Sequence, residues 1–394
     1  MKSILYLSTN GLAEPLGRSQ ILPYLVGLSK RYKIIVLSNE KKFDLRNEKN
    51  IKNIKKIVKK NNIIWDYEEF KYNKISKPFL LFSKFIKGCF YCYKYKVKII
   101  HCRSYLPNLV GLAIKFFIKK PVIFDMRGLW PEEIALGISS GRESLVYKIL
   151  KYLERLNIKK SDHIISLTNA AIYNFLIDQY QLDIQKTTTI PTCVDIDRFQ
   201  FYPIKESSTK KFSCIGTILS DWFLIDWLTS FIKCVDEYDS KAIFEIITRD
   251  CKETLLSKMA LTPNLKNKIL IRSATPDQMP KLLISHTASA MFFNSDISKL
   301  GSSPTRFGEI LAVGRPIICN KGVGDLDKIV EENKVGIIAN NPNYEFMMNS
   351  VSKLYKIIED PLISLRCRNL AESYYSLSKG IENYSKIYEM LKND

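Results

Sequence analysis

Short apolar runs alternate with longer stretches of helical periodicity along the chain, and this alternation constrains the fold more than any other feature. Short apolar runs predict buried strands, and apolar residues that recur every three to four positions predict helices packed against them. Such alternation indicates parallel sheets, because a crossover between parallel strands usually contains a helix. The predicted strands of the first half are Ile4–Ser8, Lys33–Leu37, Val97–His101, Val122–Phe124 and His163–Leu167, and its helices include Ser19–Ser29, Leu109–Ile118 and Leu145–Leu156.

The second half repeats this alternation. Its predicted strands are Phe212–Ile215, Ala242–Thr248, Lys268–Ile271, Ala290–Phe293 and Pro316–Cys319, and its helices are Leu224–Tyr238, Met279–Ile284, Arg306–Val313 and Asp325–Glu331. The 394 residues exceed the roughly 250–300 at which a single core stops growing. We therefore predict two doubly wound α/β domains, residues 1–195 and 205–375, and a closing helix within residues 376–394 that returns to the first domain. Ligands of such sheets bind beyond the carboxyl ends of the strands.

Positive charge is concentrated in the first half of the chain. The net charge is +20, and residues 1–200 hold 35 Lys and Arg against 17 Asp and Glu, most densely between Lys52 and Lys98. The segment Phe79–Tyr95 mixes lysines with aromatic residues, a combination that suits the surface of an anionic membrane leaflet. A simple solvated face is the alternative reading of the same charge. The chain carries no RNA- or DNA-binding motif, so no nucleic-acid partner is predicted.

The apolar runs and the cysteines bear on the compartment. No run reaches about 18 apolar residues, so no membrane-spanning helix is predicted. Met1–Ser8 has the pattern of a first strand rather than of a signal peptide. Nine scattered cysteines favour a reducing compartment, and the lone pair Cys89 and Cys92 is predicted to pack in the core. We expect a cytoplasmic protein, peripheral on the inner face of the cell membrane.

The segment Ser302–Pro316 carries the strongest indication of chemistry. Ser302 and Ser303 predict a loop and a helix cap, and Gly314 and Pro316 predict the end of the helix and the start of a strand. A helix N-terminus with free N–H groups, flanked by Arg306, is a site for phosphate. A carboxylate one turn along the helix, Glu309, can accept both hydroxyls of a ribose.

This segment resembles the donor-site motif of glycosyltransferase family 4, in which a Glu is followed by small residues, Gly, one further residue, Pro and a strand. The resemblance implies the GT-B fold, in which two Rossmann-like domains face each other across a cleft, and it places Glu309 on the nucleotide ribose. The first of the family's two glutamates would fall at Gly301 and is missing. The Ser-Pro-Thr-Arg version is similar to a subgroup that makes bacterial surface polysaccharides such as O-antigen or capsule.

Further segments are similar to the family in register. Asn10–Gln20 resembles its glycine loop, in which Gly17 permits close backbone approach and Arg18 supplies positive potential to the donor diphosphate. Gly216–Trp222 occupies the place of the Arg and Lys that bind the diphosphate in relatives, and neither is present. Arg249 and Arg306 are predicted to supply this charge instead. The predicted donor-binding residues are Glu309, Arg306, Thr305, Ser303, Arg249, Gly17, Arg18, Gly216, Gly324 and Asp325.

The candidate catalytic residues are Asp125, Arg127 and His101. In relatives a His stands near the reacting centre at the strand end where Asp125 lies here, with Arg127 two residues on. A purely structural Asp–Arg pair remains open. His101 follows a predicted strand, and a core role for it is open beside a catalytic one.

Two Asp-x-Asp patterns, Asp195–Asp197 and Asp325–Asp327, match the motif by which other glycosyltransferases hold a metal ion. The first is similar to the family's hinge entry and the second begins a predicted helix, where Asp is a usual cap, so no metal site and no cofactor are predicted.

The resemblance implies a retaining, metal-independent glycosyltransferase that moves a hexose-type sugar from a UDP- or GDP-sugar to a lipid-linked or growing saccharide. One alternative is a nucleotide-sugar 2-epimerase of the same fold. Another is a non-catalytic basic protein that binds membranes or nucleic acid. A dinucleotide-dependent oxidoreductase has no support, because no GxGxxG motif follows the first strand.

Overall fold

The computed structural model describes residues 1–70, 76–204 and 208–391. The predicted basic segment, the second predicted domain and the predicted closing helix each include positions outside the described residues, namely 71–75, 205–207 and 392–394. The chain divides into two compact units. The first unit comprises Met1–Pro191 together with Leu377–Asp394, and the second comprises Thr192–Ser376.

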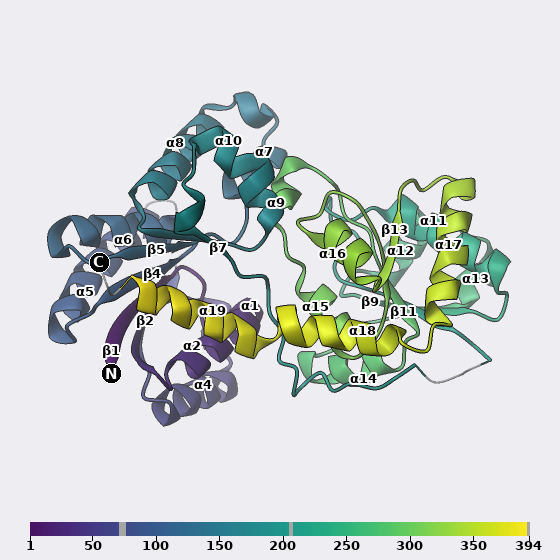
Figure 1. Ribbon diagram of the computed structural model, residues 1–394, viewed down its shortest axis with the longest axis horizontal. Helices are drawn as coiled ribbons and strands as arrows, with labels where there is room; N and C mark the ends of the chain where they lie inside the picture. Colours follow the sequence, from purple (N-terminus) through teal and green to yellow (C-terminus); the bar gives the residue numbers. More distant parts are fainter. Residues whose placement is uncertain (71–75, 205–207, 392–394) are drawn as a thin grey trace. The chain divides into compact units, whose positions relative to one another are not determined.

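The first unit is built on seven parallel strands in the order β3-β2-β1-β4-β5-β6-β7 (Figure 1). Its central strands contain apolar runs because both faces of the sheet are covered, and Leu5, Ile35 and Ile100 have no exposed surface. The strands are β1 (Lys2–Ser8), β2 (Tyr32–Lys41), β3 (Ile64–Phe70), β4 (Ile99–Arg103), β5 (Val122–Asp125), β6 (His163–Ser166) and β7 (Thr187–Thr189).

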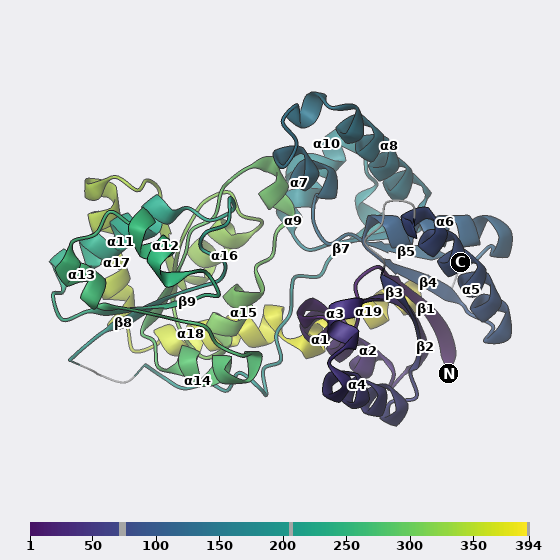
Figure 2. The same cartoon turned by 180° about the vertical axis from the view of Figure 1, so that it is seen from behind.

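Helices connect these strands, and α8 lies beside α7 and α10 (Figure 2). The α-helices of the first unit are α1 (Pro15–Gln20), α2 (Leu22–Leu28), α3 (Lys42–Leu45), α4 (Glu48–Lys60), α5 (Ser76–Lys94), α6 (Tyr105–Ile118), α7 (Trp130–Leu136), α8 (Leu145–Lys160), α9 (Asn169–Ala171), α10 (Ile177–Tyr180) and α19 (Leu377–Met390). The last of them, α19, returns to this unit and packs on α2. Gly27 of α2 permits the close packing, since a Cβ there would lie 2.1 Å from the side chain of Ile381.

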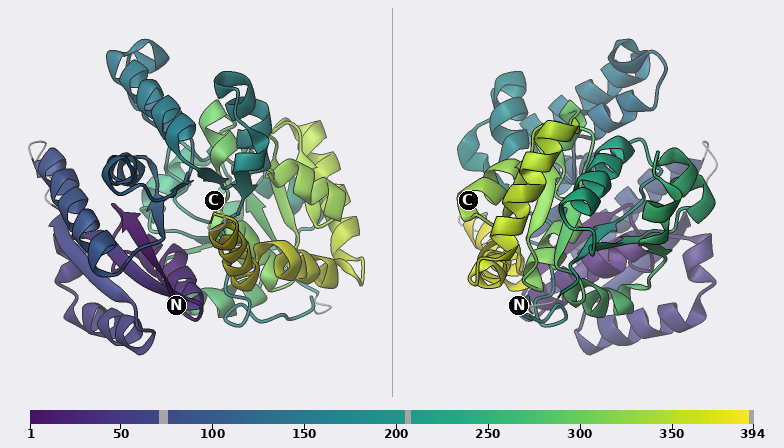
Figure 3. Two further views of the ribbon diagram at one scale, coloured as in Figure 1. Left: turned by 60° about the vertical axis from the view of Figure 1, so that its left-hand side comes forward. Right: turned by 90° about the vertical axis from the view of Figure 1, so that its right-hand side faces the viewer.

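The second unit has six parallel strands in the order β10-β9-β8-β11-β12-β13. They are β8 (Lys211–Ile215), β9 (Ile243–Ile247), β10 (Ile269–Arg272), β11 (Ala288–Met291), β12 (Ile317–Asn320) and β13 (Gly336–Ala339). Its α-helices are α11 (Ile225–Tyr238), α12 (Lys252–Lys258), α13 (Pro263–Asn267), α14 (Met279–Ile284), α15 (Thr305–Ala312), α16 (Leu326–Asn333), α17 (Tyr344–Ile358) and α18 (Ile363–Leu370). Helices α11 and α17 lie side by side (Figure 3) and close one apolar core with Phe212 and Phe231.

Both sheets confirm the predicted doubly wound α/β class. The strand order reverses between β1 and β4 in the first unit and between β8 and β11 in the second. At such a reversal the loops after the two neighbouring strands diverge, so the carboxyl edge there is the expected place for a ligand.

Several predicted boundaries are corrected. The predicted helix Ser19–Ser29 is two helices, α1 and α2, which meet at Ile21, since Pro23 has no N–H to continue the helical bonding from α1. Strands β4 and β11 are each displaced by two residues from the predictions Val97–His101 and Ala290–Phe293. None of the described helices is long and apolar enough to cross a membrane.

Candidate functional site

The strand register brings three polar residues into one row at the carboxyl edge of the first sheet. Ser8 at the end of β1 is the partner of Arg103 at the end of β4, and Arg103 is the partner of Asp125 at the end of β5. This row crosses the point at which the strand order reverses. His101 therefore lies within β4 and not after it, which corrects the predicted strand end.

Asp125 is the centre of a buried polar cluster. Its carboxylate lies 3.4 Å from the guanidinium of Arg127, 3.7 Å from that of Arg103 and 3.4 Å from Nε2 of His101. Burial alone would raise the pKa of Asp125, but the charges of Arg127 and Arg103 and the hydrogen bond from His101 hold it below its usual value. The predicted catalytic residues are thus brought together around an ionised carboxylate.

Helix α19 completes this cluster with two tyrosines that the sequence did not suggest as site residues. The hydroxyl of Tyr384 donates to Asp125 at 3.1 Å, and the hydroxyl of Tyr388 lies 2.6 Å from Nδ1 of His101. Burial lowers the pKa of His101, which favours the neutral imidazole. A neutral ring that donates from Nε2 to the acceptor Asp125 must accept from Tyr388 at Nδ1. The four-residue spacing of the tyrosines, which places both on one helix face, was the available signal.

Accessibility separates the members of the cluster. Asp125 has no exposed surface and His101 is 1% exposed, whereas the side chain of Arg127 is 12% exposed. Two guanidinium groups face one carboxylate, so the cluster carries an excess positive charge. Nε of Arg103 and Nε of Arg127 are both buried without a hydrogen-bond partner in the described part of the chain. Arg127 is therefore the member best placed to meet a ligand, and Asp125 and His101 lie behind it.

In the predicted glycine loop, three backbone N–H groups donate hydrogen bonds to carboxylates of the first unit. The N–H groups of Leu12 and Ala13 donate to the carboxylate of Glu40 at 2.7 and 3.0 Å, and that of Gly11 donates to Glu14 at 2.9 Å. Gly17 is required because a Cβ there would lie 1.8 Å from the carbonyl oxygen of Gly11. The neighbouring Arg18 is exposed on the short helix α1.

Helix α15 of the second unit carries Glu309, the residue predicted to bind the ribose. Glu309 lies in its second turn with 11% of its side chain exposed and is paired with Arg306. Burial raises the pKa of Glu309, although Arg306 and Arg198 oppose the shift. Arg198 was not predicted; its guanidinium donates to the carbonyl of Pro276 at 2.5 Å.

The predicted cap of α15 is wrong. The helix starts at Thr305 after Pro304, and no side chain bonds to its first N–H groups. The hydroxyl of Ser303 instead accepts from the backbone N–H of Thr192 at 3.1 Å, because Pro304 separates it from the helix. At the other end Gly314 adopts a φ of +83°, as predicted for the helix stop.

The loop after β8 lies at the reversal point of the second sheet. Asp250, which follows β9, accepts from the N–H groups of Ile218 at 2.5 Å and Leu219 at 3.0 Å and so fixes this loop. Gly216 at its start has a φ of +149°, and a Cβ there would meet nothing within 4 Å. A ligand can therefore approach the backbone at Gly216 closely. Arg249 is exposed two residues beyond the end of β9.

A lysine that the sequence reasoning missed contacts this loop from the segment after β11. Nζ of Lys299 is 4.1 Å from the centre of the Trp222 ring, a cation–π contact between the segment after β11 and the loop after β8. The backbone of Trp222 accepts from the N–H of Asn294 at 2.8 Å, and that of Lys299 accepts from the N–H of Gly324 at 2.8 Å. The loops after β8, β11 and β12 thus meet at Lys299. No local pattern pairs these residues, so only the fold reveals the contact.

The remaining predicted positions lie around the turn after β12. Gly324 has a φ of +53°, which explains its residue type. Asp325 stands at the N-cap position directly before α16, but its side chain makes no capping bond to the helix, contrary to the prediction. In the other Asp-x-Asp pattern, Asp195 accepts from the N–H groups of Asp197 and Arg198 at 3.1 and 3.2 Å and so holds a turn.

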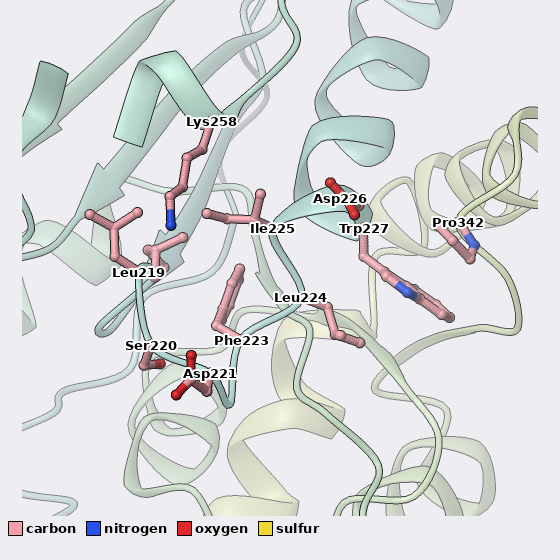
Figure 4. Close-up of a pocket in the computed structure, with 11 residues that line it drawn as sticks. Leu219, Ser220, Asp221, Phe223, Leu224, Ile225, Asp226, Trp227, Lys258 and Pro342 are labelled. Atoms are coloured by element: carbon pink, nitrogen blue, oxygen red, sulfur yellow. The ribbon is translucent and has the colours of Figure 1, made fainter. Parts of the chain in front are cut away.

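A pocket of about 400 Å³ is lined by the loop after β8 and the start of α11 (Figure 4). Asp221, Asp226, Trp227 and Lys258 are among its lining residues, and none of the predicted donor-binding residues is. We assign it no role in donor binding.

Comparison with known proteins supports the fold and the family. Residues 26–198 match the profile of the family described as Glycosyltransferase Family 4. No curated protein sequence matches the chain.

Solved structures match over nearly the whole chain. HepE from Anabaena in complex with UDP is 13% identical, covers 99% of this chain and 100% of its own, and has a TM-score of 0.69. Further HepE structures contain UDP with glucose or UDP-glucose. A glycosyltransferase from Rickettsia africae is 15% identical, with 99% and 98% coverage and a TM-score of 0.70. WaaG, a glycosyltransferase involved in lipopolysaccharide biosynthesis, is 12% identical, with 95% and 97% coverage and a TM-score of 0.61. The GT-B fold is confirmed.

Proposed function

Residues 26–198 match the profile of glycosyltransferase family 4, and on this basis we propose that the protein transfers a sugar from a nucleoside diphosphate to a saccharide acceptor. The second unit binds the donor, and the first unit binds the acceptor. The observation that carries the proposal is the partly accessible carboxylate of Glu309 in α15, beside Arg306 and next to the reversal point of a doubly wound sheet.

Glu309 holds the ribose of the donor. Its two oxygens accept from the two ribose hydroxyls, while the charge of Arg306 favours the ionised form against the burial that raises the pKa of Glu309. Because Arg306 is occupied by Glu309, it contributes less to the phosphates than its place near the start of α15 suggests. HepE, which shares the fold, contains UDP or UDP-glucose in its structures, and this supports a nucleotide-sugar donor here.

The donor phosphates lie along the loop after β8. Gly216 gives them close approach to the backbone, and Lys299 and Arg249 supply positive charge. These cations stand in for the missing Arg and Lys of the loop. Stabilisation of the leaving diphosphate is then electrostatic and needs no metal ion. Thr305, Ser303, Gly324 and Asp325 complete the donor side, and the family resemblance adds Gly17 and Arg18 as donor residues.

Arg127 meets the reacting groups from the first unit. Asp125 fixes its guanidinium, and His101 fixes Asp125, so these two act as positioning residues. A guanidinium held by an ionised carboxylate is preorganised, which lowers the cost of stabilising charge that develops in the transition state. Transfer proceeds with retention of the anomeric configuration, as the family resemblance implies.

The acceptor is a lipid-linked or growing saccharide of a bacterial surface polysaccharide, and the protein works at the inner face of the cell membrane. The excess positive charge of residues 1–200 supports an anionic membrane as partner. The likeness to WaaG, which is described as involved in lipopolysaccharide biosynthesis, points to the same class of acceptor.

Release of nucleoside diphosphate tests the proposal. The purified protein is mixed with UDP- or GDP-sugars and with detergent-solubilised lipid-linked saccharides, and the product is analysed by NMR for its anomeric configuration. We expect acceptor-dependent release of UDP or GDP and a retained configuration. Free epimer formed without acceptor would contradict transfer and would indicate the epimerase instead.

A further inference from the structure

Helices α5 and α6 share an exposed apolar surface. They pack against each other, and the rings of Phe85 and Phe117 lie 5.7 Å apart between their centres. The exposed residues of α5 recur every three or four positions and therefore lie on one side of the helix. More than half of each of the following side chains is exposed: Phe79, Phe82, Ile86, Phe90 and Tyr93 on α5, and Phe116 and Phe117 on α6. We call these seven residues the α5–α6 face.

A basic pocket of about 480 Å³ adjoins this face. Its lining residues include Lys115, Lys119, Lys120 and Lys160 together with Phe116 and Asp162. Asp162 is taken by one lysine, since Nζ of Lys115 lies 2.7 Å from both of its carboxylate oxygens. In the described part of the chain no carboxylate pairs with the other three lysines. The pocket is therefore a cation-rich cavity suited to an anion.

The pocket and the face are continuous. Phe116 belongs to both, and Nζ of Lys119 lies 5.2 Å from the centre of its ring. Aromatic side chains settle at the boundary between headgroups and acyl chains, and lysines beside them reach the phosphates. A soluble polyanion such as nucleic acid matches the lysines but leaves the exposed aromatic residues uncovered.

We infer that the pocket binds the phosphate of an anionic phospholipid while the α5–α6 face lies in the bilayer interface. The inference rests on the proposed function only in that it places the acceptor at a membrane. It goes further in naming the residues and the headgroup chemistry. It also distinguishes a specific site from general attraction of a basic protein to an anionic surface.

Helix α4 provides a comparison that distinguishes a specific phospholipid site from general attraction to an anionic surface. Its lysines 52, 55, 56, 59 and 60 are exposed, and its apolar residues Ile51, Ile54 and Val58 are buried. Within the described residues this helix carries much positive charge without an exposed apolar side chain. The double variant Lys55→Gln/Lys59→Gln is therefore a matched control for Lys119→Gln/Lys120→Gln.

Vesicle flotation measures the effect. The full chain and both double variants are mixed with vesicles of phosphatidylcholine alone or with added phosphatidylglycerol. We expect binding only with phosphatidylglycerol, weakened about 10- to 30-fold in Lys119→Gln/Lys120→Gln and within about threefold of wild type in the α4 control. Equal losses of vesicle binding in the two double variants would overturn the inferred phosphate site and indicate general charge attraction alone.

Two further arms identify the source of the phosphate. Phe116→Ser/Phe117→Ser should also lose vesicle binding, and inorganic phosphate at matched ionic strength should displace little protein. Wild-type vesicle binding by this variant, together with displacement by inorganic phosphate, would show a soluble phosphate site and overturn the inference. Sugar transfer to a detergent-solubilised acceptor should stay unchanged in the lysine variants with native circular dichroism. A protein that binds vesicles but transfers no sugar would contradict the proposed function alone.

Discussion

Each unit of the molecule buries a carboxylate beside a histidine and cationic side chains, but at different positions along the strands. In the first unit Asp125, the last residue of β5, faces His101 and Arg127. In the second unit Glu245, the third residue of β9, lies 2.6 Å from His286 and 2.6 Å from Lys211. Both carboxylates have no exposed surface.

Position along the strand decides what such a cluster can do. Asp125 lies at the carboxyl edge, where the strand order reverses, and its partner Arg127 keeps some exposed surface. Glu245 lies within its strand, beside Lys211 at the amino end of β8 and His286 before β11. A ligand of a parallel sheet binds beyond the carboxyl ends, so only the first cluster is placed to serve a reaction. A buried acid paired with a histidine is therefore no evidence of a site by itself.

Removal of either carboxylate should destabilise the protein. Asp125→Ala leaves the guanidinium groups of Arg103 and Arg127 largely buried without their carboxylate, and we expect the free energy of unfolding of the first unit to fall by about 3–5 kcal/mol. Glu245→Ala leaves the buried His286 without its acceptor, but Lys211 and Arg272 keep exposed surface, so we expect a smaller loss of about 1–3 kcal/mol in the second unit. Urea unfolding monitored by circular dichroism measures this. Asp197→Ala, on an exposed carboxylate, is the control and should change the free energy by less than about 0.5 kcal/mol. An Asp125→Ala variant with the same free energy of unfolding as wild type would contradict the stabilising role of this carboxylate.

Turnover should then separate the two clusters. Asp125→Asn releases the guanidinium of Arg127 from its fixed place, and we expect kcat to fall about 100-fold. Glu245→Gln should leave kcat of the folded protein within about threefold of wild type. The measurement is acceptor-dependent release of nucleoside diphosphate at saturating donor, normalised to folded protein. Equal losses in both variants would mean that the position along the strand does not matter.

Donor affinity should depend on the second unit. Glu309→Ala removes the acceptor for the ribose hydroxyls, and we expect the Kd for donor to rise about tenfold or more with little change in unfolding. Calorimetry measures the Kd. Glu332→Ala, on an exposed residue of α16, is the matched control and should bind donor as wild type does. Unchanged donor binding in Glu309→Ala would remove the ribose role.

Acid should weaken the Glu245 cluster over a defined range. Although burial opposes ionisation, His286 and Lys211 lower the pKa of Glu245 from 4.5 to about 2. A carboxyl whose pKa is depressed by folding stabilises above its unfolded pKa, so this stabilisation is complete above pH about 4.5 and is lost as the pH falls toward 2. The urea midpoint of wild type should drop more between pH 5 and pH 3 than that of Glu245→Gln. Parallel curves would contradict the assigned pKa.

The smallest expected effect is that of metal removal. Asp195 is engaged in a turn through two backbone N–H groups, and cationic side chains are available for the leaving diphosphate. EDTA should therefore leave turnover unchanged. Loss of activity that Mn²⁺ restores would reinstate an Asp-x-Asp site.

The central strands could be predicted from the sequence, whereas three of the four edge strands could not; the fourth, β10, has the apolar run Ile269–Ile271 and was predicted. Strands β1, β4 and β8 are buried on both faces and read as apolar runs, whereas β3, β7 and β13 stand at sheet edges and were missed. β7 is three threonines, and β3 includes Asp66, Glu68 and Glu69. A half-exposed edge strand has no continuous apolar signal to distinguish it from a loop.

The candidate site divides in a similar way. Residues near one another in sequence, such as Asp125 with Arg127 and Arg306 with Glu309, were predicted together and do lie together. Tyr384 is 259 residues from Asp125 in the sequence and Tyr388 is 287 residues from His101, and the fold brings each pair together. Lys299 likewise contacts Trp222 only through the fold. Such partners leave no local pattern in a single sequence.

Thermal unfolding in the presence of nucleotide sugars tests the central claim most directly. A donor that binds only the folded protein raises its Tm by mass action. We predict that at least one UDP- or GDP-sugar raises the Tm of the wild type in a concentration-dependent way and raises that of Glu309→Ala much less. A wild-type Tm that no nucleotide sugar changes, at concentrations up to the millimolar range, would contradict a donor site in the second unit.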